Sequence, residues 1–370
     1  MQLCAGRHIC TSAKNLTLVS ATDEVPLRNF PRRWSSLAQP DLSHPEVITN
    51  ALGIGRFWLA RGLDGFRIDA ALSAFPDKIK ENWGLDVEDN LTRLFIEEAR
   101  RIKPDCFIMF EGFERLEELR QLADYENCAV YNWRPRNLAT DALRDPAKLP
   151  ILMSYLKELE HAQQSRDELV NLGPEHDAFD FEDPWAKLYY TELLLLHFLY
   201  AFMPGYMLVF NGQIFGKQHA YKKQIEKTLP APRVTDADSA ERETGKKLFG
   251  LRKKYPQLVR GDYRFLEHGE QDVICLARFD DNQIVIGVIN IDSDAKEVVL
   301  SLSDIISGRL SPSDIEHAHY TQDVLILKNN AEGWISETRD NMPAEKLLRE
   351  GLYVGINPRS CQVIRLRLNV

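Results

Sequence analysis

Two charged side chains two residues apart could do chemistry together. Residues 62–70 read Gly-Leu-Asp-Gly-Phe-Arg-Ile-Asp-Ala, which places Arg67 and Asp69 in a short apolar run. Side chains two apart on a β-strand share a face. A carboxylate beside a guanidinium stays ionised at neutral pH, as a carboxylate nucleophile must. A purely structural Arg–Asp ion pair at the end of a strand explains the same pattern equally well.

A third charged side chain, Glu111, ends the next apolar run, residues 106–110. Its apolar approach favours a raised pKa, which suits a group that donates a proton near neutral pH. The alternative is a carboxylate stabilised by the dipole of the following helix. Because side chains at the carboxyl ends of parallel strands meet at one edge of a sheet, we expect Glu111 beside Asp69.

The elements that must position these residues alternate between helix and strand up to about residue 260. Apolar runs predict strands at 65–69, 106–110, 128–131, 168–171 and 206–210. Helical spacing predicts helices at 46–60, 88–102, 114–124, 150–164, 185–202 and 239–254. This alternation predicts a parallel sheet with helical crossovers.

The pattern changes after about residue 262 to short β-rich runs separated by turn residues. The runs lie at 264–266, 273–277, 284–288, 298–300 and 363–366, with a hairpin loop predicted at 280–282. We therefore expect an antiparallel β domain at the C-terminus.

Two segments carry a resemblance to a known family. Residues 65–70, with Phe-Trp-Leu at 57–59 and Gly62, resemble the nucleophile strand of the α-amylase family of glycoside hydrolases, family 13. Upstream, residues 39–47 read Gln-Pro-Asp-Leu-Ser-His-Pro-Glu-Val and resemble the segment entering the helix before that strand. The resemblance covers roughly residues 30 to 370 and implies an α/β fold, a TIM (β/α)₈ barrel followed by a β-sandwich.

Only five of the eight strands of such a barrel can be recognised. A βα unit takes on the order of 30 residues, so residues 1–40 are too few for three more. We therefore expect an incomplete TIM (β/α)₈-type barrel with strands 4 to 8 at 41–260, then an antiparallel β-sandwich at 261–370. Residues 1–40 would be a lead, the remnant of the loop domain before strand 4. The incomplete barrel would have open strand edges. We therefore expect that another chain covers these edges, that the chain self-associates through them, or that it is a fragment of a longer protein.

The resemblance also implies roles for the charged residues. Asp69 matches the nucleophile and Glu111 the acid/base of a retaining mechanism, which needs two carboxyl groups about 5 to 5.5 Å apart. Arg67 matches a residue that orients the site. The dipeptide His176-Asp177 matches a pair that binds the sugar, with Asp177 strengthening its hold in the transition state.

Some positions depart from the family pattern or match it weakly. Glu175 stands where the family has Asn before His-Asp, and Gln213 stands where an acid is usual. Tyr131 and Trp133 follow the third strand and are candidates to stack on sugar rings, although aromatic residues there pack as often. The family's first motif, an Asp followed by Asn-His, has no match. A calcium site is possible in the family, but its ligand region is absent here, so we expect no cofactor and no metal.

Composition and charge limit the kinds of partner and the cell compartment that the sequence favours. The 370 residues carry a net charge of −9 without a Lys/Arg stripe, which argues against nucleic acid as a partner. The longest apolar run, residues 193–200, is far shorter than a membrane span. No secretory signal is evident. Six scattered cysteines without metal spacing predict buried thiols, for instance at Cys106 and Cys128, in a cytoplasmic setting.

These observations support two hypotheses. The first is a retaining α-glycoside hydrolase or transglycosidase acting on an α-glucan or oligosaccharide, whose activity as this chain alone is open. The second is a non-catalytic or fragmentary relative that acts as a glucan-binding or partner subunit.

Overall fold

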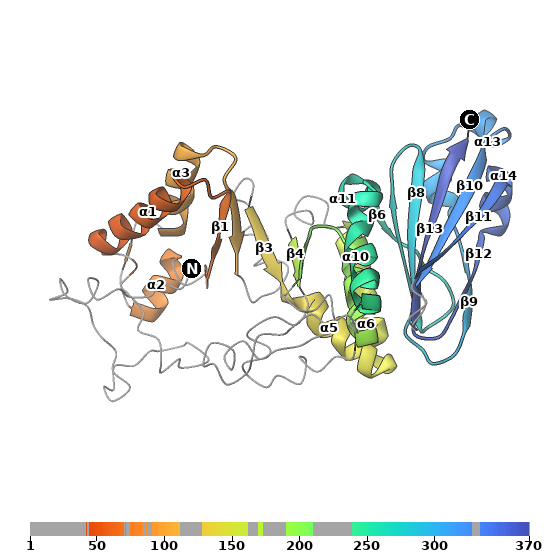
Figure 1. Ribbon diagram of the computed structural model, residues 1–370, viewed down its shortest axis with the longest axis horizontal. Coiled ribbons are helices and arrows are strands. Elements are labelled where there is room, and N and C mark those ends of the chain that lie inside the picture. The colour runs from red at the N-terminus through yellow and green to blue at the C-terminus, as the bar shows by residue number, and fades with distance from the viewer. Residues whose placement is uncertain are drawn as a thin grey trace. The chain divides into compact units, whose positions relative to one another are not determined.

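Residues 1–131 and 132–370 each form a unit of their own in the computed structural model (Figure 1). The structure describes residues 42, 44–69, 71, 75–83, 86–87, 91–111, 128–161, 169–172, 190–209, 239–327 and 334–369.

The first unit contains parallel strands with helices between them. Its elements are α1 (Pro45–Leu59), β1 (Gly65–Ile68), α2 (Pro76–Trp83), α3 (Leu91–Ile102), β2 (Phe107–Phe110) and β3 (Cys128–Asn132). β1, β2 and β3 are neighbours in that order, and both pairs are parallel. The strands predicted at 65–69, 106–110 and 128–131 are therefore confirmed.

The residues before α1 explain where that helix begins. The Nδ1 atom of His44 accepts a hydrogen bond from the Glu46 backbone N–H at 3.3 Å, so His44 caps the helix. Pro45 at the first helical position has no N–H to leave unsatisfied. Glu46 places a negative charge at the positive end of the helix dipole. The family-like segment at 39–47 thus acts locally as a helix start.

α1 and α3 pack side by side next to β1 (Figure 1). Gly55 makes this approach possible, because a Cβ atom there would lie 2.9 Å from the Phe95 ring. Phe95 in turn meets Phe66 of β1 edge to face, with ring centroids 5.1 Å apart. Gly65 is needed for the strand pairing itself, since its Cβ would lie 2.1 Å from the Phe107 carbonyl oxygen.

The second unit begins with helices and two more parallel strands. They are α5 (Trp133–Arg144), the 3₁₀ helix η2 (Pro146–Lys148), α6 (Leu149–His161), β4 (Leu169–Leu172), α8 (Tyr190–Phe202), β5 (Tyr206–Leu208), α10 (Ser239–Lys254) and α11 (Gln257–Arg260). β4 and β5 pair in parallel. These strands and the helices at 150–164, 185–202 and 239–254 match the predicted series.

A buried amide chain holds this part of the second unit together. The Nδ2 atom of Asn132, the last residue of β3, donates to the Tyr155 hydroxyl at 2.6 Å and to Oδ1 of Asn171 in β4 at 3.2 Å. The Nδ2 atom of Asn171 donates to the Pro204 carbonyl at 2.8 Å, just before β5. Polar groups buried this deeply need such partners, so the chain ties Asn132 to α6, to β4 and to the turn before β5.

The C-terminal part is an antiparallel β-sandwich, as predicted. A six-stranded sheet has the order β11-β10-β13-β8-β7-β6, and a two-stranded sheet pairs β12 with β9. The strands are β6 (Asp262–Phe265), β7 (Val273–Phe279), β8 (Gln283–Asn290), β9 (Lys296–Leu300), β10 (His319–Leu327), β11 (Trp334–Pro343), β12 (Leu352–Ile356) and β13 (Ser360–Asn369). Short helices α12 (Ser303–Ser307), α13 (Pro312–Ile315) and α14 (Ala344–Glu350) complete it. The apolar core lies between the two sheets.

Strands β7 and β8 of the six-stranded sheet are covered on both faces. β7 and all but the first residue of β8 are buried, because one face meets the sandwich core and the other meets α8. Gly287 of β8 lies against this helix, where a Cβ atom would come within 2.7 Å of the Phe202 ring. The continuous apolar runs of these strands follow from this double burial.

A half-buried arginine satisfies the C-terminal end of α8. Arg252 of α10 donates to the carbonyl oxygens of Tyr200 at 2.8 Å, Ala201 at 3.1 Å and Met203 at 2.6 Å, and also to Gly205. These are the carbonyls that a helix end leaves without partners. Burial and the nearby charge of Arg278 lower the pKa of Arg252 to about 10, so it stays charged at neutral pH.

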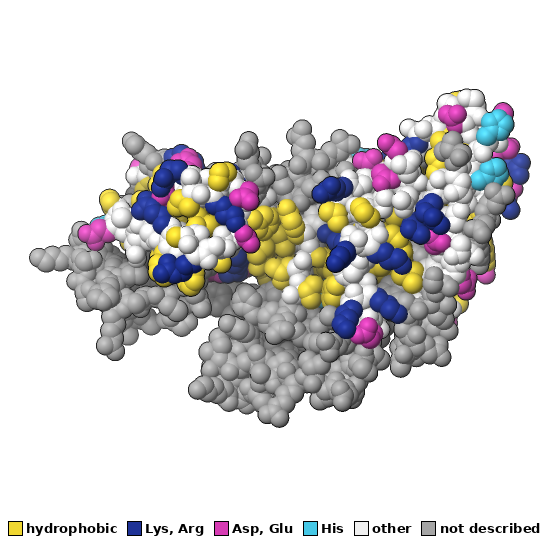
Figure 2. Space-filling view, turned by 45° about the horizontal axis from the view of Figure 1, so that its top comes forward, with side chains coloured by type: hydrophobic (Ala, Val, Ile, Leu, Met, Phe, Trp, Pro, Cys, Tyr) yellow, Lys and Arg dark blue, Asp and Glu magenta, His cyan; other side chains and the backbone are white. Residues whose placement is uncertain are grey.

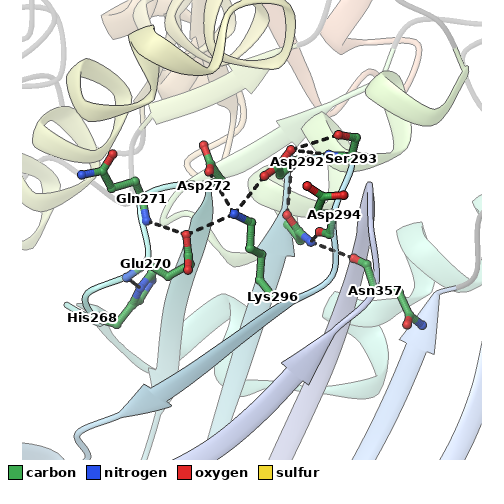
Figure 3. Close-up of polar contacts among 10 residues, drawn as sticks. His268, Glu270, Gln271, Asp272, Asp292, Ser293, Asp294, Lys296 and Asn357 are labelled. Atoms are coloured by element: carbon green, nitrogen blue, oxygen red, sulfur yellow. Dashed lines mark hydrogen bonds and ion pairs between the residues drawn. The ribbon is translucent and has the colours of Figure 1, made fainter.

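A lysine enclosed by carboxylates holds the turn from β8 to β9 (Figure 3). Nζ of Lys296 lies 2.9 Å from Asp292, 3.3 Å from Asp272 and 3.4 Å from Glu270. The hydrogen bond from Lys296 lowers the pKa of Asp292 to about 2, and the same bond raises the pKa of Lys296. The cluster ties the start of β7 to the start of β9.

Several elements differ from the predictions. The structure adds elements that the sequence patterns did not indicate, namely α2, α5, η2, α11, α12, α13, α14, β10, β11 and β12. The helix predicted at 114–124 lies outside the described residues. Cys106 and Cys128 are buried free thiols, as expected. The predicted domain boundaries after residues 40 and 260 stay predictions.

Candidate active site

Strand register brings the predicted carboxyl groups together in the first unit. Ile68 pairs with Phe110, so the next residues, Asp69 and Glu111, leave the sheet side by side. The backbone N–H of Glu111 donates to the Ile68 carbonyl at 2.9 Å, which carries the pairing one residue further. The expectation that both side chains lie at the same sheet edge is met by this geometry.

Arg67 bridges the two carboxyl groups. One terminal nitrogen, Nη1, pairs with Oδ1 of Asp69, and the other, Nη2, lies 2.8 Å from Oε2 of Glu111. A planar guanidinium can serve two carboxyl groups at once in this way. Glu111 is buried, with 4% of its side chain exposed, whereas 46% of the Asp69 side chain is exposed. The exposed carboxylate is the one that a ligand could reach.

The electrostatics of the pair favour an ionised Asp69. Partial burial would raise its pKa, but a hydrogen bond with Glu111 and the charge of Arg67 outweigh this and lower the pKa. Burial also opposes the charge of Arg67, while Glu111 and Asp69 together raise its pKa. The site therefore holds a negative Asp69 beside a positive Arg67 at neutral pH.

The two candidate aromatic residues lie within elements and are buried. Tyr131 belongs to β3 with 6% exposed, and Trp133 begins α5 with 8% exposed. The Tyr131 ring centroid lies 5.5 Å from the guanidinium carbon of Arg67. The Trp133 ring lies 4.2 Å from the guanidinium carbon of Arg136. Stacking of these rings on a sugar stays a prediction.

The other predicted site residues fall outside the described part of the chain. These are His176 and Asp177, and also Glu175 and Gln213, which depart from the family pattern. Their roles stay predictions. The contact between Tyr131 and Arg67 was missed from the sequence, although Tyr131 follows Val130, which pairs with Phe110 just as Ile68 does. Register was the signal that could have found it.

Within the described ranges, no group of three or more His, Cys, Asp or Glu side chains could hold a metal ion. Among the same residues, no helix is long and apolar enough to cross a membrane.

The surface over α1 and α3 carries charges of both signs. Figure 2 shows Lys and Arg side chains interspersed with Asp and Glu and with hydrophobic side chains on this face. Arg56 pairs with Glu98, which also binds Arg101 at 2.8 Å, and Arg93 pairs with Glu97 at 2.6 Å. The described residues on this face form no continuous basic patch.

Comparisons with curated proteins find distant relatives among α-glucan enzymes. The chain is 26% identical over 303 residues to a cyclomaltodextrinase of Geobacillus thermopakistaniensis, covering 75% of this chain and 47% of the relative. It is 42% identical over 59 residues to maltase A2 of Drosophila melanogaster, 13% of this chain and 10% of that protein. The chain thus spans about half the length of the first relative. No family model matches it.

Solved structures show the same fold. The α-amylase of Geobacillus thermoleovorans, complexed with acarbose, matches 88% of this chain and 64% of its own with a TM-score of 0.60 at 16% identity. The cyclic α-maltosyl-(1→6)-maltose hydrolase of Arthrobacter globiformis matches 97% of this chain and 70% of its own, with a TM-score of 0.62 at 14% identity. The parallel strands and the C-terminal sandwich are therefore those of a partial TIM-type barrel with its following domain.

Proposed function

We propose that the chain is a divergent member of the α-amylase family of glycoside hydrolases and that it cleaves or transfers α-glucosidic bonds with retention of configuration. The observation that carries this proposal is the pair Asp69 and Glu111, bridged by Arg67 at the ends of β1 and β2. The substrate would be an α-glucan or oligosaccharide, since the relatives are named for acting on such sugars.

The electrostatics support a division of roles between the two carboxyl groups. The lowered pKa of Asp69 fits the group that must be ionised to attack, and Glu111 would be the group that carries a proton when the substrate is bound. Asp69 is then the nucleophile and Glu111 the acid, the arrangement that a retaining mechanism requires.

The proposed reaction proceeds in two displacements. The Asp69 carboxylate attacks the anomeric carbon while Glu111 gives its proton to the departing glycosidic oxygen, which leaves a glycosyl ester on Asp69. Glu111, now ionised, takes a proton from water or from a sugar hydroxyl. That oxygen attacks the same carbon, and the Asp69 carboxylate departs. Hydrolysis and transglycosylation differ only in which oxygen attacks.

The proposed reaction needs room for the sugar between the two carboxyl groups, which retaining enzymes hold roughly 5 to 5.5 Å apart. A substrate would enter from the side of the exposed Asp69, while Arg67 keeps its contact to Asp69. His176 and Asp177 match a family pair that binds the hydroxyls of the sugar, and we expect the same role for them here.

The experiment measures turnover of maltooligosaccharides and an aryl α-glucoside by the full chain, beside Asp69→Ala and Glu111→Gln. We expect both variants to lose at least about 10²-fold in kcat/KM. A 5-fluoroglucosyl fluoride should leave one glycosyl adduct on the Asp69 peptide, and Asp69→Ala should show none. Turnover unchanged in Asp69→Ala would refute the assignment. A folded chain without turnover or adduct would favour the glucan-binding or partner role.

A further inference from the structure

The two-stranded sheet of the sandwich has an outer face that carries exposed apolar side chains. In β9 and β12, residues buried in the sandwich core alternate with exposed ones, so the exposed residues share the outer face. Such a face normally carries polar side chains. Here the cross-strand pair Tyr353 and Val299 is 57% and 53% exposed. These two are the large hydrophobic side chains that the described part of the sandwich leaves exposed.

A glycine extends the outer face along β12. Gly355 pairs with Glu297, and a Cβ atom at Gly355 would meet nothing within 4 Å, so no described side chain or backbone covers it. A glycine inside a strand marks a bulge, a bend, or a place where a ligand or another backbone approaches closely. The register from Leu352 to Ile356 has no shift, so this glycine forms no bulge. Its φ angle is not positive, so the backbone does not require glycine either. Gly355 therefore provides open space for a ligand.

The size and the charge of the outer face limit what could bind there. A stable protein interface covers about 800 Å² on each partner, with roughly 20 to 30 residues. This face offers two apolar side chains and a glycine, which is too little for a second copy of the chain. The carboxylate of Glu297, a diagonal neighbour of Tyr353, disfavours nucleic acid, phosphate and anionic membranes. The face thus suits a small neutral ligand with one apolar side and with hydroxyl groups at its rim.

A pyranose ring has this form, because its C–H groups make an apolar side and its hydroxyl groups lie around the edge. The apolar side can lie on an aromatic ring, and the hydroxyl groups can donate hydrogen bonds to a carboxylate. The ring of Tyr353, the open space at Gly355 and the carboxylate of Glu297 lie on one face at neighbouring positions. They supply the contacts that such a sugar needs.

We propose that the outer face of β9 and β12 is a second sugar-binding site, separate from the candidate active site, where a glucose unit of an α-glucan stacks on Tyr353. Val299 widens the apolar surface, and Gly355 leaves room for the next unit of the glucan. The α-glucan as ligand rests on the proposed function, whereas the site rests on the outer face itself. A single ring on an open face binds weakly, so the site keeps a long glucan near the protein rather than selecting a short sugar.

The test follows the ¹H–¹⁵N amide signals of the full chain during titration with maltoheptaose, in an Asp69→Ala background that prevents turnover. We expect the amides of Glu297 and Gly355 to shift with a millimolar Kd. Tyr353→Ala should raise this Kd at least about fivefold, because it removes the stacking surface. The matched control is Tyr206→Ala, which removes a tyrosine of similar exposure, 48%, from β5 and should leave the Kd unchanged.

Gly355→Val separates loss of the site from loss of the fold. A β-branched residue suits a strand better than glycine, and the space at this position is open, so the variant should be at least as stable in urea as the parent chain. The same side chain fills the space that the sugar would use. We therefore expect maltoheptaose to bind the outer face at least about fivefold more weakly, without a loss of stability.

An unchanged Kd in both Tyr353→Ala and Gly355→Val would overturn the proposal. Shifts of these amides that depend on protein concentration and not on sugar would also overturn it, because they would make a second copy of the chain the occupant. Turnover by the wild-type chain without shifts in β9 and β12 would refute this site alone. Shifts in these strands, in a chain with neither turnover nor adduct, would support the site and refute the proposed catalysis alone.

Discussion

Replacing Arg67 by Met removes a positive charge that contacts both carboxyl groups of the candidate site. Two unit charges 4 Å apart interact by about 4 kcal/mol at an effective dielectric constant of 20. At 1.36 kcal/mol per pKa unit, this corresponds to about 3 units. Because 46% of the Asp69 side chain is exposed, water screens the pair, and we expect a rise in the pKa of Asp69 of about 1 to 2 units.

The assay is the pH dependence of kcat/KM in the Arg67→Met chain. A nucleophile must be ionised in the free enzyme, so the acid limb of the profile follows the pKa of Asp69. A raised pKa moves this limb to higher pH by the same 1 to 2 units, and Arg67→Lys, which keeps a charge but not the fork, should move it less. A ¹³C titration of the Asp69 carboxyl group measures the same change without substrate.

A matched control is Arg61→Met in the same unit. Arg61 lies over the Phe57 ring at 3.4 Å and donates to the Phe57 carbonyl at 3.0 Å, so its loss changes the net charge equally without touching the carboxyl groups. Its acid limb should match that of the wild-type chain. If Arg67→Met and Arg61→Met gave the same limb and the same Asp69 titration, the bridging role of Arg67 would be refuted.

Three further predictions concern the second unit. Gly287→Ala should lower the free energy of unfolding, measured in urea, by about 1 to 3 kcal/mol, because its Cβ meets the Phe202 ring. Adding Phe202→Leu should recover part of this loss. Equal stability of Gly287→Ala and the wild-type chain would contradict the packing. Arg252→Met should lower the free energy of unfolding by roughly 2 to 4 kcal/mol in the same assay, because it leaves buried carbonyls at the end of α8 without donors. A change below about 0.5 kcal/mol would contradict the capping role of Arg252. Lys296→Met should lower the melting temperature at pH 7, and the difference in melting temperature from the wild-type chain should shrink as the pH falls from about 4 to about 2. The reason is that the pKa of Asp292 is lower in the folded state, so its ion pair stabilises the fold above the unfolded-state pKa and ceases to do so as Asp292 is protonated. A difference in melting temperature that did not depend on pH would exclude the ion pair as its source.

The parallel strands could be predicted because their apolar runs are continuous in the sequence. The run at 128–131 is fully buried in β3, whereas in β2 the buried residues alternate with half-buried ones. The rule that side chains gather at the carboxyl ends of such strands then placed Asp69 beside Glu111 without any coordinates.

The elements that were missed have mixed patterns for identifiable reasons. α5 carries Pro135, a residue that usually breaks helices. It lies in the first turn of α5, where a backbone N–H makes no hydrogen bond within the helix, so proline is tolerated there. β10 was missed because it carries polar residues such as Asp323, which binds Nε of Arg365 on the neighbouring strand β13 at 2.9 Å. Such cross-strand pairs stabilise a sheet but erase the apolar signal on which the prediction relied.

The candidate site was harder to complete because residue type does not fix direction. Tyr131 was noticed as an aromatic residue near a strand end, but whether its ring would face a sugar or Arg67 depends on the register of β3 with β2. The buried partner of Asn132 on β4 could not be predicted either, since Asn171 is 39 positions away.

The burial of β7 and β8 on both faces determines how residues 132–370 unfold. The same strands supply one wall of the sandwich core and the surface against which α8 rests. Removing the sandwich would leave the apolar face of α8 in water, and removing α8 would expose the sheet. We therefore expect no transition in which the C-terminal strands melt alone. Slow-exchanging amides of α8 and β8 should lose protection together, as one cooperative unit of residues 132–370.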